Sequence, residues 1–244
     1  MMPTAADLYD VIDVTWPPLT VREVGPFRLR RAAGAGGRVN AASLLIAGDP
    51  GQAAVKAAEA AMTGTGPRLF LIRDGETDLD ARLAAMGYRV ADPVTFFVAP
   101  ADMLAARDLP RVCAFTLWEP LAIQIDIWEQ GGITAARRAV MDRADCPKTS
   151  ILGRLNDSPA AAGYVGLAGD IAMLHALTVL PHQRRQGMGG FALTAAARWT
   201  VAEGGHWISL VVAQDNAGGN ALYTALGMTP VGSYHYRIHP EDRK

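Results

Sequence analysis

The chain has 244 residues, of which half are hydrophobic and 19% are charged, and its formal net charge is -1. This is the composition of a soluble globular protein with one large domain or two small ones, and the near-neutral charge argues against a general nucleic-acid binder. Because there is no membrane-length apolar run, no secretory signal and no metal-like spacing of the two cysteines, we expect a cytoplasmic protein with reduced thiols, no metal and no membrane partner.

The first half of the chain predicts a strand at 68–73, a helix at 78–88 that ends at Gly87, and a strand at 93–99. A segment that mixes prolines with charges follows and reads as a connection between two lobes. We therefore expect an N-terminal lobe over residues 1–100, a linker over 101–111 and a second lobe over 112–244.

The second half predicts a longer series of elements. A strand at 112–117 precedes two helical stretches at 120–130 and 134–144, and a hairpin follows across an Asn-Asp-Ser-Pro turn. Residues 171–180 read as a central strand, and a helix then runs to about Glu203. The remaining elements are a strand at 207–213, a helix at 218–228 and a strand at 233–238. Their order is β-αα-β-β-β-α-β-α-β.

The two halves resemble each other weakly near their ends. Aligned on Gly87 and Gly227, the segments correspond without a gap, so that Leu83 falls opposite Tyr223. In the same alignment, Asp80 matches Asn220 and Glu76 matches Asn216. A strand, helix and strand thus occur twice, and two related α/β lobes are the simplest source of such a repeat.

The stretch VLPHQRRQGMGG, residues 179–190, has the build of a phosphate-binding loop. Glycine amides can approach an anion closely, and the following helix directs its free N–H groups at the same place. GMGGFA also fits a dinucleotide fingerprint, but six residues separate the strand from Gly187 and no acidic residue stands at the expected distance. A loop that wraps a pyrophosphate is the better interpretation, and a solvated glycine-rich turn is the alternative.

These residues resemble the GNAT acyltransferases, the GCN5-related N-acetyltransferases. Their L-x-V-x-P strand and [RQ]-x-x-G-x-[GA] loop match Leu177, Val179, Pro181, Arg184, Gly187 and Gly189. Their N-x-x-[AN]-x-x-L-Y-x-x-[LF]-G pattern matches Asn216, Asn220, Ala221, Leu222, Tyr223, Leu226 and Gly227. The resemblance covers about residues 112–238.

The resemblance implies an α/β (α+β) GNAT fold, in which helices flank a mixed, mostly antiparallel sheet. The first lobe is similar to a degenerate copy, as in a two-lobed subgroup of the family, so we expect two tandem lobes with the active one at the C-terminal end. Gly34, Gly36 and Gly37 follow no L-x-V-x-P strand, and we interpret them as a turn.

The resemblance also implies where acetyl-CoA lies, between the strand that ends at Val179 and the strand 207–213. Main-chain groups would pair with the pantetheine arm, the loop would hold the pyrophosphate, and two asparagines would contact the arm or orient the last helix. The expected cofactor-binding residues are Leu177, Thr178, Val179, Arg184, Arg185, Gln186, Gly187, Met188, Gly189, Gly190, Asn216 and Asn220.

Two residues are candidates for proton transfer. A phenol is a neutral donor at pH 7, so Tyr223 suits protonation of the departing sulfur. On an extended strand, His175 would share a face with Met173, Leu177 and Val179 and could deprotonate the amine. LHALTV, residues 174–179, resembles the same strand in arylalkylamine N-acetyltransferases, where a second histidine replaces Met173. A carboxylate or water could serve as the base instead.

The expected function is N-acetylation of a primary amine by direct attack in a ternary complex with acetyl-CoA. The acceptor would be a small-molecule amine or a peptide amine, and neither its identity nor the oligomeric state follows from the sequence. An acyl-CoA-binding sensor or scaffold without turnover is the alternative, and a nicotinamide-dependent enzyme that uses GMGGFA is a second rival.

Overall fold

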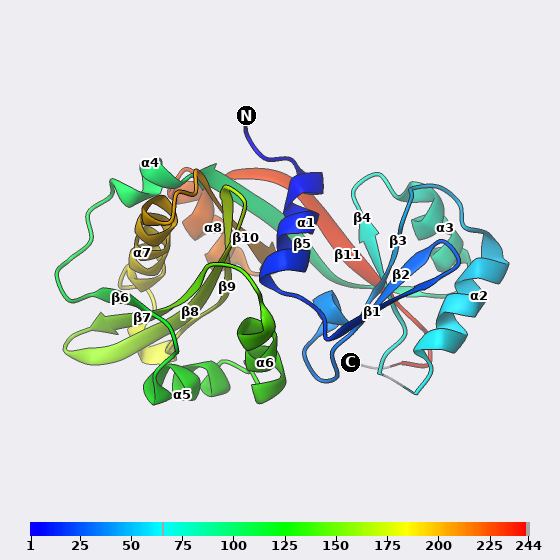
Figure 1. Cartoon of the computed structure of the whole chain (residues 1–244), viewed down its shortest axis with the longest axis horizontal. Coiled ribbons are helices and arrows are strands. Elements are labelled where there is room, and N and C mark those ends of the chain that lie inside the picture. Colours follow the sequence, from blue (N-terminus) through cyan, green and yellow to red (C-terminus); the bar gives the residue numbers. More distant parts are fainter. Residues whose placement is uncertain (65, 243–244) are drawn as a thin grey trace.

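The computed structural model describes residues 1–64 and 66–242 (Figure 1). The helices are α1 (Ala5–Thr15), α2 (Gly51–Met62), α3 (Thr77–Ala85), α4 (Ala101–Ala105), α5 (Ala122–Gln130), α6 (Ala135–Arg143), α7 (Met188–Ala202) and α8 (Ala217–Ala225), with short 3-10 turns η1 (Gly37–Val39) and η2 (Pro181–Gln183). The strands are β1 (Thr20–Val24), β2 (Phe27–Arg31), β3 (Ala42–Leu44), β4 (Leu69–Arg73), β5 (Arg89–Pro100), β6 (Ala114–Leu117), β7 (Lys148–Leu155), β8 (Ser158–Ala168), β9 (Ile171–Val179), β10 (Trp207–Ala213) and β11 (Thr229–Ile238).

The strands form one 11-stranded sheet in the order β1-β2-β3-β4-β11-β5-β10-β9-β8-β7-β6. Among the described strands, only the β3–β4 and β9–β10 pairs are parallel, so the expected mixed, mostly antiparallel sheet is confirmed. The two lobes exchange their last strands. Strand β5 leaves the first lobe to pair with β10, and β11 leaves the second to pair with β4 (Figure 1).

Each lobe ends in the same series of elements, which confirms the predicted repeat. In the first lobe β3, α2, β4, α3 and β5 follow one another, and in the second lobe β9, α7, β10, α8 and β11 do so. The connection between the lobes contains α4, a short helix that the sequence pattern does not predict and that packs against α7. The residue boundaries expected for the lobes stay predictions.

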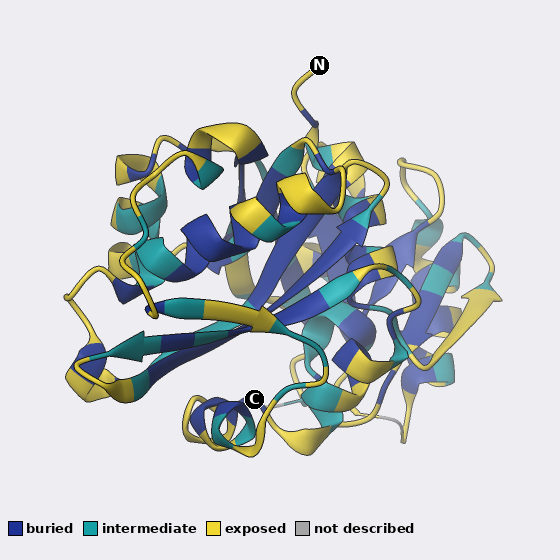
Figure 2. Cartoon of the chain, turned by 60° about the vertical axis from the view of Figure 1, so that its left-hand side comes forward, coloured by how far each residue is buried: buried dark blue, intermediate teal, exposed yellow. Residues whose placement is uncertain are grey.

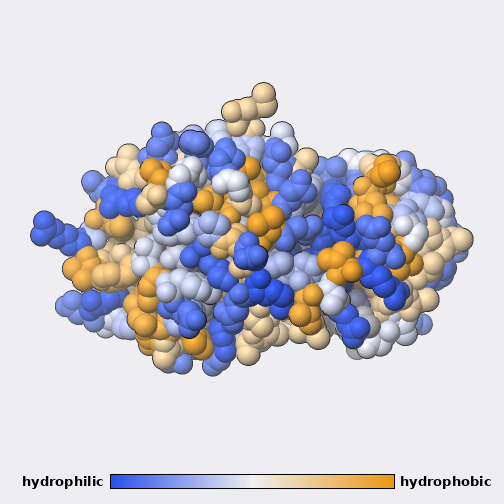
Figure 3. All heavy atoms as spheres, in the orientation of Figure 1, coloured by the Kyte–Doolittle hydropathy of each residue, from blue (hydrophilic) through white to orange (hydrophobic). Residues whose placement is uncertain are grey.

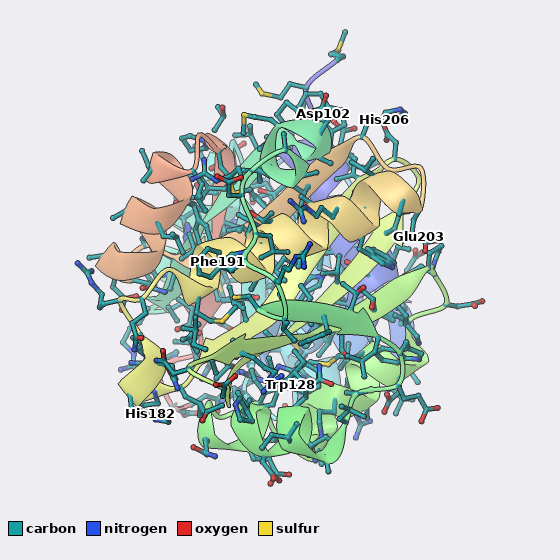
Figure 4. All side chains as sticks on the ribbon, turned by 90° about the vertical axis from the view of Figure 1, so that its left-hand side faces the viewer. Asp102, Trp128, His182, Phe191, Glu203 and His206 are labelled. Carbon is teal, nitrogen blue, oxygen red and sulfur yellow. The ribbon has the colours of Figure 1, made fainter. Side chains whose placement is uncertain are left out.

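Helices cover both faces of the sheet, and the central strands are buried between them (Figure 2). Over the second lobe, Trp128 of α5 and Phe191 of α7 lie on opposite faces (Figure 4). The core on the α5 and α6 face continues into the first lobe, because it also includes Leu8 of α1, Leu71 of β4 and Tyr236 of β11. A separate core lies beneath α7. Within the described ranges, no helix is both long enough and apolar enough to cross a lipid bilayer.

The hairpin between β7 and β8 turns more tightly than the sequence pattern suggests. Its two linking residues, Asn156 and Asp157, both have positive φ angles, of 51° and 56°. This is the backbone of a two-residue type I′ turn, which asparagine and aspartate tolerate better than most residues. Ser158 and Pro159, which the pattern assigns to the turn, belong to β8 instead.

Candidate functional site

A split in the sheet lies between β9 and β10. The two strands pair in parallel from Trp207 and Ile171 to Leu210 and Leu174, and their pairing ends there. Strand β10 stays paired with β5 as far as Ala213, and β9 stays paired with β8 as far as Val179. The last residues of β9 therefore present main-chain groups to an open edge, where an extended ligand could add itself as a strand.

A β-bulge marks the start of this split. Ala176 and Leu177 of β9 lie opposite the single residue Gly163 of β8, and Ala176 has a positive φ of 52°. The indole Nε1 of Trp128 donates a hydrogen bond of 2.9 Å to the Ala176 carbonyl oxygen. The bulge therefore turns this carbonyl toward α5 and interrupts the regular alternation of side chains along β9.

The bulge overturns one expectation from the sequence. A Cβ atom built on Gly163 would lie 3.4 Å from Leu174 and 3.5 Å from Leu177, so these two leucines share a face. Residue His175 lies on the opposite face, packed against Trp16 and Tyr164. The prediction that His175 shares a face with Leu177 and Val179 is wrong, because the extra residue at the bulge reverses the alternation beyond it.

A cavity of about 760 Å³ occupies the split. Its walls come from the end of β9, the glycine-rich loop, the start of α7 and the face of α8. The lining residues are Gly131, Leu177, Thr178, Val179, Gln183, Arg184, Arg185, Gly187, Met188, Gly189, Asn216, Gly218, Gly219, Ala221, Leu222 and Tyr223. Most of the residues expected to bind a cofactor thus come together around one cavity, whereas Gln186, Gly190, Asn220 and His175 are not among its lining residues.

The glycine-rich loop delivers the start of α7 to this cavity. Gly187 is the N-cap residue, with a left-handed φ of 84°, and no side chain caps the helix. The first N–H groups of α7 therefore lack intrahelical partners and point out of the helix end. Arg184 and Arg185 are exposed on the same loop, and Arg184 Nε donates to the Val179 carbonyl at 3.1 Å. Such a loop suits an anion.

The loop also buries a polar atom that the sequence pattern does not single out. Gln183 of η2 lines the cavity and is buried, and its Oε1 has no hydrogen-bond partner among the described residues. Gln186, by contrast, is exposed and bonds to Asn156 and to the His182 carbonyl. His182 lies at the outer edge of the loop in Figure 4. Glutamine at 183 carries no spacing signal that would have identified it.

The two asparagines hold the turn into α8. The Asn216 side chain caps the helix by accepting from the Gly219 amide at 2.9 Å. Asn220 Nδ2 donates to the carbonyls of Ala213 at 3.0 Å and Asn216 at 2.8 Å. Both side chains are thus engaged in orienting the helix that carries Tyr223, the second of the two roles considered for them.

Tyr223 lines the cavity from α8, and its ring contacts Phe97 at a centroid distance of 5.9 Å. Burial raises the pKa of Tyr223 to about 12. Its hydroxyl has no hydrogen-bond partner in the part of the chain that the structure describes. The phenol is therefore protonated at neutral pH and available to a ligand.

His175 is buried at the junction of the lobes, and both of its ring nitrogens are engaged. Nε2 lies 2.9 Å from the Thr15 hydroxyl and Nδ1 lies 3.0 Å from Arg38 Nη1. Burial, and then the charge of Arg38, lowers the pKa of His175 well below its ordinary value. Since Arg38 is always a donor, Nδ1 accepts and Nε2 carries the proton of a neutral ring.

Two carboxylates and two aromatic side chains of the second lobe have surroundings that suit structural roles. Glu129 forms an ion pair with Arg138 at 2.9 Å, and Asp170 lies at the exposed turn before β9 near His206. Trp128 and Tyr164 are fully buried in the core. Among the described residues, no group of three or more histidine, cysteine, aspartate or glutamate side chains is arranged to hold a metal ion.

Within its described residues, the first lobe has no equivalent open loop. At the start of α2, which corresponds to α7, the Asp49 carboxylate accepts from the Gly51 amide at 2.9 Å and pairs with Arg82 of α3. The hydrogen bond from Arg82 holds the pKa of Asp49 down at about 2. A carboxylate of the chain thus stands where the second lobe offers free amides. Gly34, Gly36 and Gly37 lie in the connection from β2 to β3, as the turn interpretation expects.

Comparison with known proteins found a family match in the second half of the chain. Residues 109–228 match the family described as Acetyltransferase (GNAT) family. A search of curated proteins with the sequence found no match.

Solved structures with the same fold span nearly the whole chain. A GCN5-related N-acetyltransferase from Kribbella flavida has a TM-score of 0.73 at 16% identity, covering 98% of this chain and 97% of its own. A conserved protein of unknown function from Staphylococcus epidermidis has a TM-score of 0.68 at 10% identity, covering 94% and 96%. A tandem GNAT protein from the clavulanic acid biosynthesis pathway has a TM-score of 0.65 at 18% identity, covering 98% and 90%. At these identities the likeness shows the fold, a tandem arrangement of two GNAT lobes.

Proposed function

We propose that the chain acetylates a primary amine with acetyl-CoA, because residues 109–228 are a domain of the GNAT acetyltransferase family. Acyl transfer from an acyl-CoA is the chemistry of this family. The proposal has three finer parts. The acyl group is acetyl, the acceptor is an amine, and the amine attacks directly in a ternary complex.

One observation carries the proposal: the open edge of β9, the uncapped start of α7 and Tyr223 border the same cavity. Acetyl-CoA presents complementary groups in the same order. Amides of its arm suit the free main-chain groups of Leu177, Thr178 and Val179, and its diphosphate suits the N–H groups at Gly187 to Gly190. An anion in the loop would also draw Arg184 away from the Val179 carbonyl.

Direct transfer forms one bond and breaks one bond. The amine nitrogen attacks the thioester carbonyl, a C–N bond forms, and the C–S bond breaks as the electron pair leaves with sulfur. We assign the protonation of that sulfur to Tyr223, whose phenol keeps its proton at neutral pH. Main-chain N–H groups at the bulge would stabilise the negative charge that develops on the carbonyl oxygen.

The amine must lose a proton in the same reaction. Direct transfer to His175 does not suit its geometry, because both ring nitrogens are engaged and the ring lies on the face of β9 opposite Leu177. We assign this proton to water at the split, one of the two alternatives to His175 that the sequence left open. His175 then acts as a positioning residue, which holds Arg38 of the first lobe against β9.

Calorimetric titration with CoA, followed by mass spectrometry of amine and peptide libraries incubated with acetyl-CoA, tests the proposal. We expect one CoA per chain, because the corresponding position of the first lobe already holds the Asp49 carboxylate, and we expect an acetylated product. Binding without any product would favour the sensor. Binding of NAD in place of CoA would favour the nicotinamide-dependent enzyme and would reject the proposal outright.

A further inference from the structure

Two arginines from different lobes lie close together where the lobes join. Arg38 lies on η1 of the first lobe, and Arg137 lies in the first turns of α6 in the second. The connection between β2 and β3 approaches α6 closely, because a Cβ atom built on Gly36 would lie 3.2 Å from Arg137 Nη2. Side chains are hydrophilic near the centre of the face shown in Figure 3, between α1 and α6 of Figure 1.

Neither arginine has a carboxylate partner among the described residues, although both are half-buried. Arg38 stacks over the Trp16 ring at 5.4 Å and contacts His175. Burial, and then the charge of Arg38, lowers the pKa of Arg137. Neighbouring arginines differ in this respect, because Arg138 pairs with Glu129 and Arg30 pairs with Asp13. Two half-buried positive charges that repel each other favour an anion between them.

This pair stands on the side of the split that faces away from α7 and α8. The cavity reaches that side, because Gly131 and Thr178 line it and a Cβ built on Gly131 would lie within 2.5 Å of Thr178 Cγ2. Arg137 follows Gly131 by six residues of the same connection and helix. Arg38 contacts His175, which precedes Leu177 by two residues, or no more than about 7 Å of strand.

We infer that Arg38 and Arg137 bind a carboxylate of the acceptor, so that the amine substrate is an amino acid. The inference rests on the proposed function, since it places the acceptor on the face of the split opposite acetyl-CoA. A guanidinium matches a carboxylate with two parallel hydrogen bonds, and no hydrogen bond of the Arg137 guanidinium is found among the described residues. Binding the carboxylate at the lobe junction leaves the amine free to enter the split beyond the bulge.

A panel of matched acceptors tests the inference. The panel contains α-, β- and γ-amino acids, each with its carboxamide and its decarboxylated amine. The rate of acetylation is measured from the release of free CoA. We expect an amino acid to exceed its carboxamide by at least about tenfold in kcat/KM. In Arg137→Gln, the KM for that amino acid should rise by about tenfold or more while kcat and the Kd for CoA change little.

Arg138→Gln is the matched control, because it removes the same charge from the next residue of α6 but from an arginine that has its own carboxylate. It should leave the preference intact. Arg38→Gln should lower the preference as Arg137→Gln does, although it also removes a partner of His175. Equal effects of Arg137→Gln on the amino acid and on its carboxamide would overturn the inference.

A binding measurement separates the inference from the proposed function. N-acetylated amino acids and their carboxamides are titrated into the protein saturated with CoA, which requires no turnover. The carboxylate forms should bind more tightly to the wild type and lose that advantage in Arg137→Gln. Failure to bind CoA would reject the proposed function. The inference would be rejected, and the proposed function would stand, if the protein bound CoA but preferred no carboxylate form. The same would follow if it acetylated only the amines that lack a carboxylate.

Discussion

At the scale of single residues, the hydroxyl of Tyr223 is the group on which acyl transfer most depends. Tyr223→Phe keeps the ring in place against Phe97 and removes only the proton donor. We expect kcat to fall by about 10²- to 10⁴-fold, the usual contribution of a general acid, while the Kd for CoA changes by less than about threefold. Steady-state kinetics and a CoA titration measure both. Equal losses in rate and affinity would instead assign Tyr223 a structural role.

The pH dependence of the reaction offers a second readout of the same residue. A raised pKa, about 12 here, means that the phenol remains protonated above the ordinary value for tyrosine. Loss of the donor should therefore begin only as the pH approaches 12, and kcat should not decline between pH 8 and pH 10 on account of Tyr223. A decline near pH 10 that disappears in Tyr223→Phe would contradict this.

Trp128 supports the site without touching the cavity. Its indole N–H holds the Ala176 carbonyl at the bulge, and the whole side chain is buried. Trp128→Phe leaves that carbonyl unpaired, which should lower the free energy of unfolding by about 1–3 kcal/mol, and it should lower kcat because the neighbouring amides shift. Urea denaturation gives the stability. Trp118→Phe is the control, since no hydrogen bond of its indole is found among the described residues, and it should cost less.

At the scale of the element, the two glycines that border α7 allow the cost of a left-handed alanine to be measured separately from a loss of CoA binding. Gly187 and Gly204 border the two ends of this helix, and each has a φ of 84°. Alanine in a left-handed conformation costs about 1–2 kcal/mol, so both Gly187→Ala and Gly204→Ala should lose about that much stability. Only Gly187→Ala should weaken CoA, by about tenfold or more, because only that glycine lines the cavity. Similar CoA affinities in the two variants would argue against the loop as the diphosphate site.

Much of the second lobe is predictable from sequence because its elements are long and its motifs are local. The predicted strand at 207–213 has the same ends as β10, and the predicted helix to Glu203 ends one residue beyond α7. The glycine-rich loop and the α8 motif each have a fixed spacing between their motif residues, so the residues that form these walls of the cavity could be identified one by one. Gln183 and Gly131 could not, since they reach the cavity only through tertiary packing.

The bulge and the first lobe show why the rest could not be predicted. A period of two assigns His175 to the face of Leu177, and one extra residue at Ala176, which no local pattern marks, reverses that assignment. In the first lobe, β1, β2 and β3 have five, five and three residues, too few to establish a period. Hence no element is predicted before residue 68, although α1 supplies Thr15, and its C-cap supplies Trp16, to the surroundings of His175.

At the scale of the whole molecule, the lobes share both a sheet and a core. Leu8 of α1, Tyr236 of β11 and Trp128 of α5 belong to one buried cluster, so the packing of the second lobe is continuous with that of the first. The exchanged strands add main-chain hydrogen bonds across the junction. We therefore expect the protein to unfold in a single cooperative transition, with the acceptor side of the site depending on both lobes.

The strand exchange predicts that the second lobe does not fold alone. A chain of residues 112–244 lacks β5, which pairs with β10 over residues 207–213, and lacks β4, which pairs with β11. The buried side chains of Ile208, Leu210 and Val212 would then lie on an unpaired edge, which favours aggregation.

Circular dichroism during urea denaturation and a CoA titration measure this outcome. Residues 112–244 should show no cooperative transition and should bind no CoA, whereas residues 89–244, which restore β5 to the sheet, should regain part of both. The intact chain is the reference for both measurements. A sharp transition and full CoA affinity in residues 112–244 would instead make the second lobe an autonomous domain, with the exchanged strand dispensable to it.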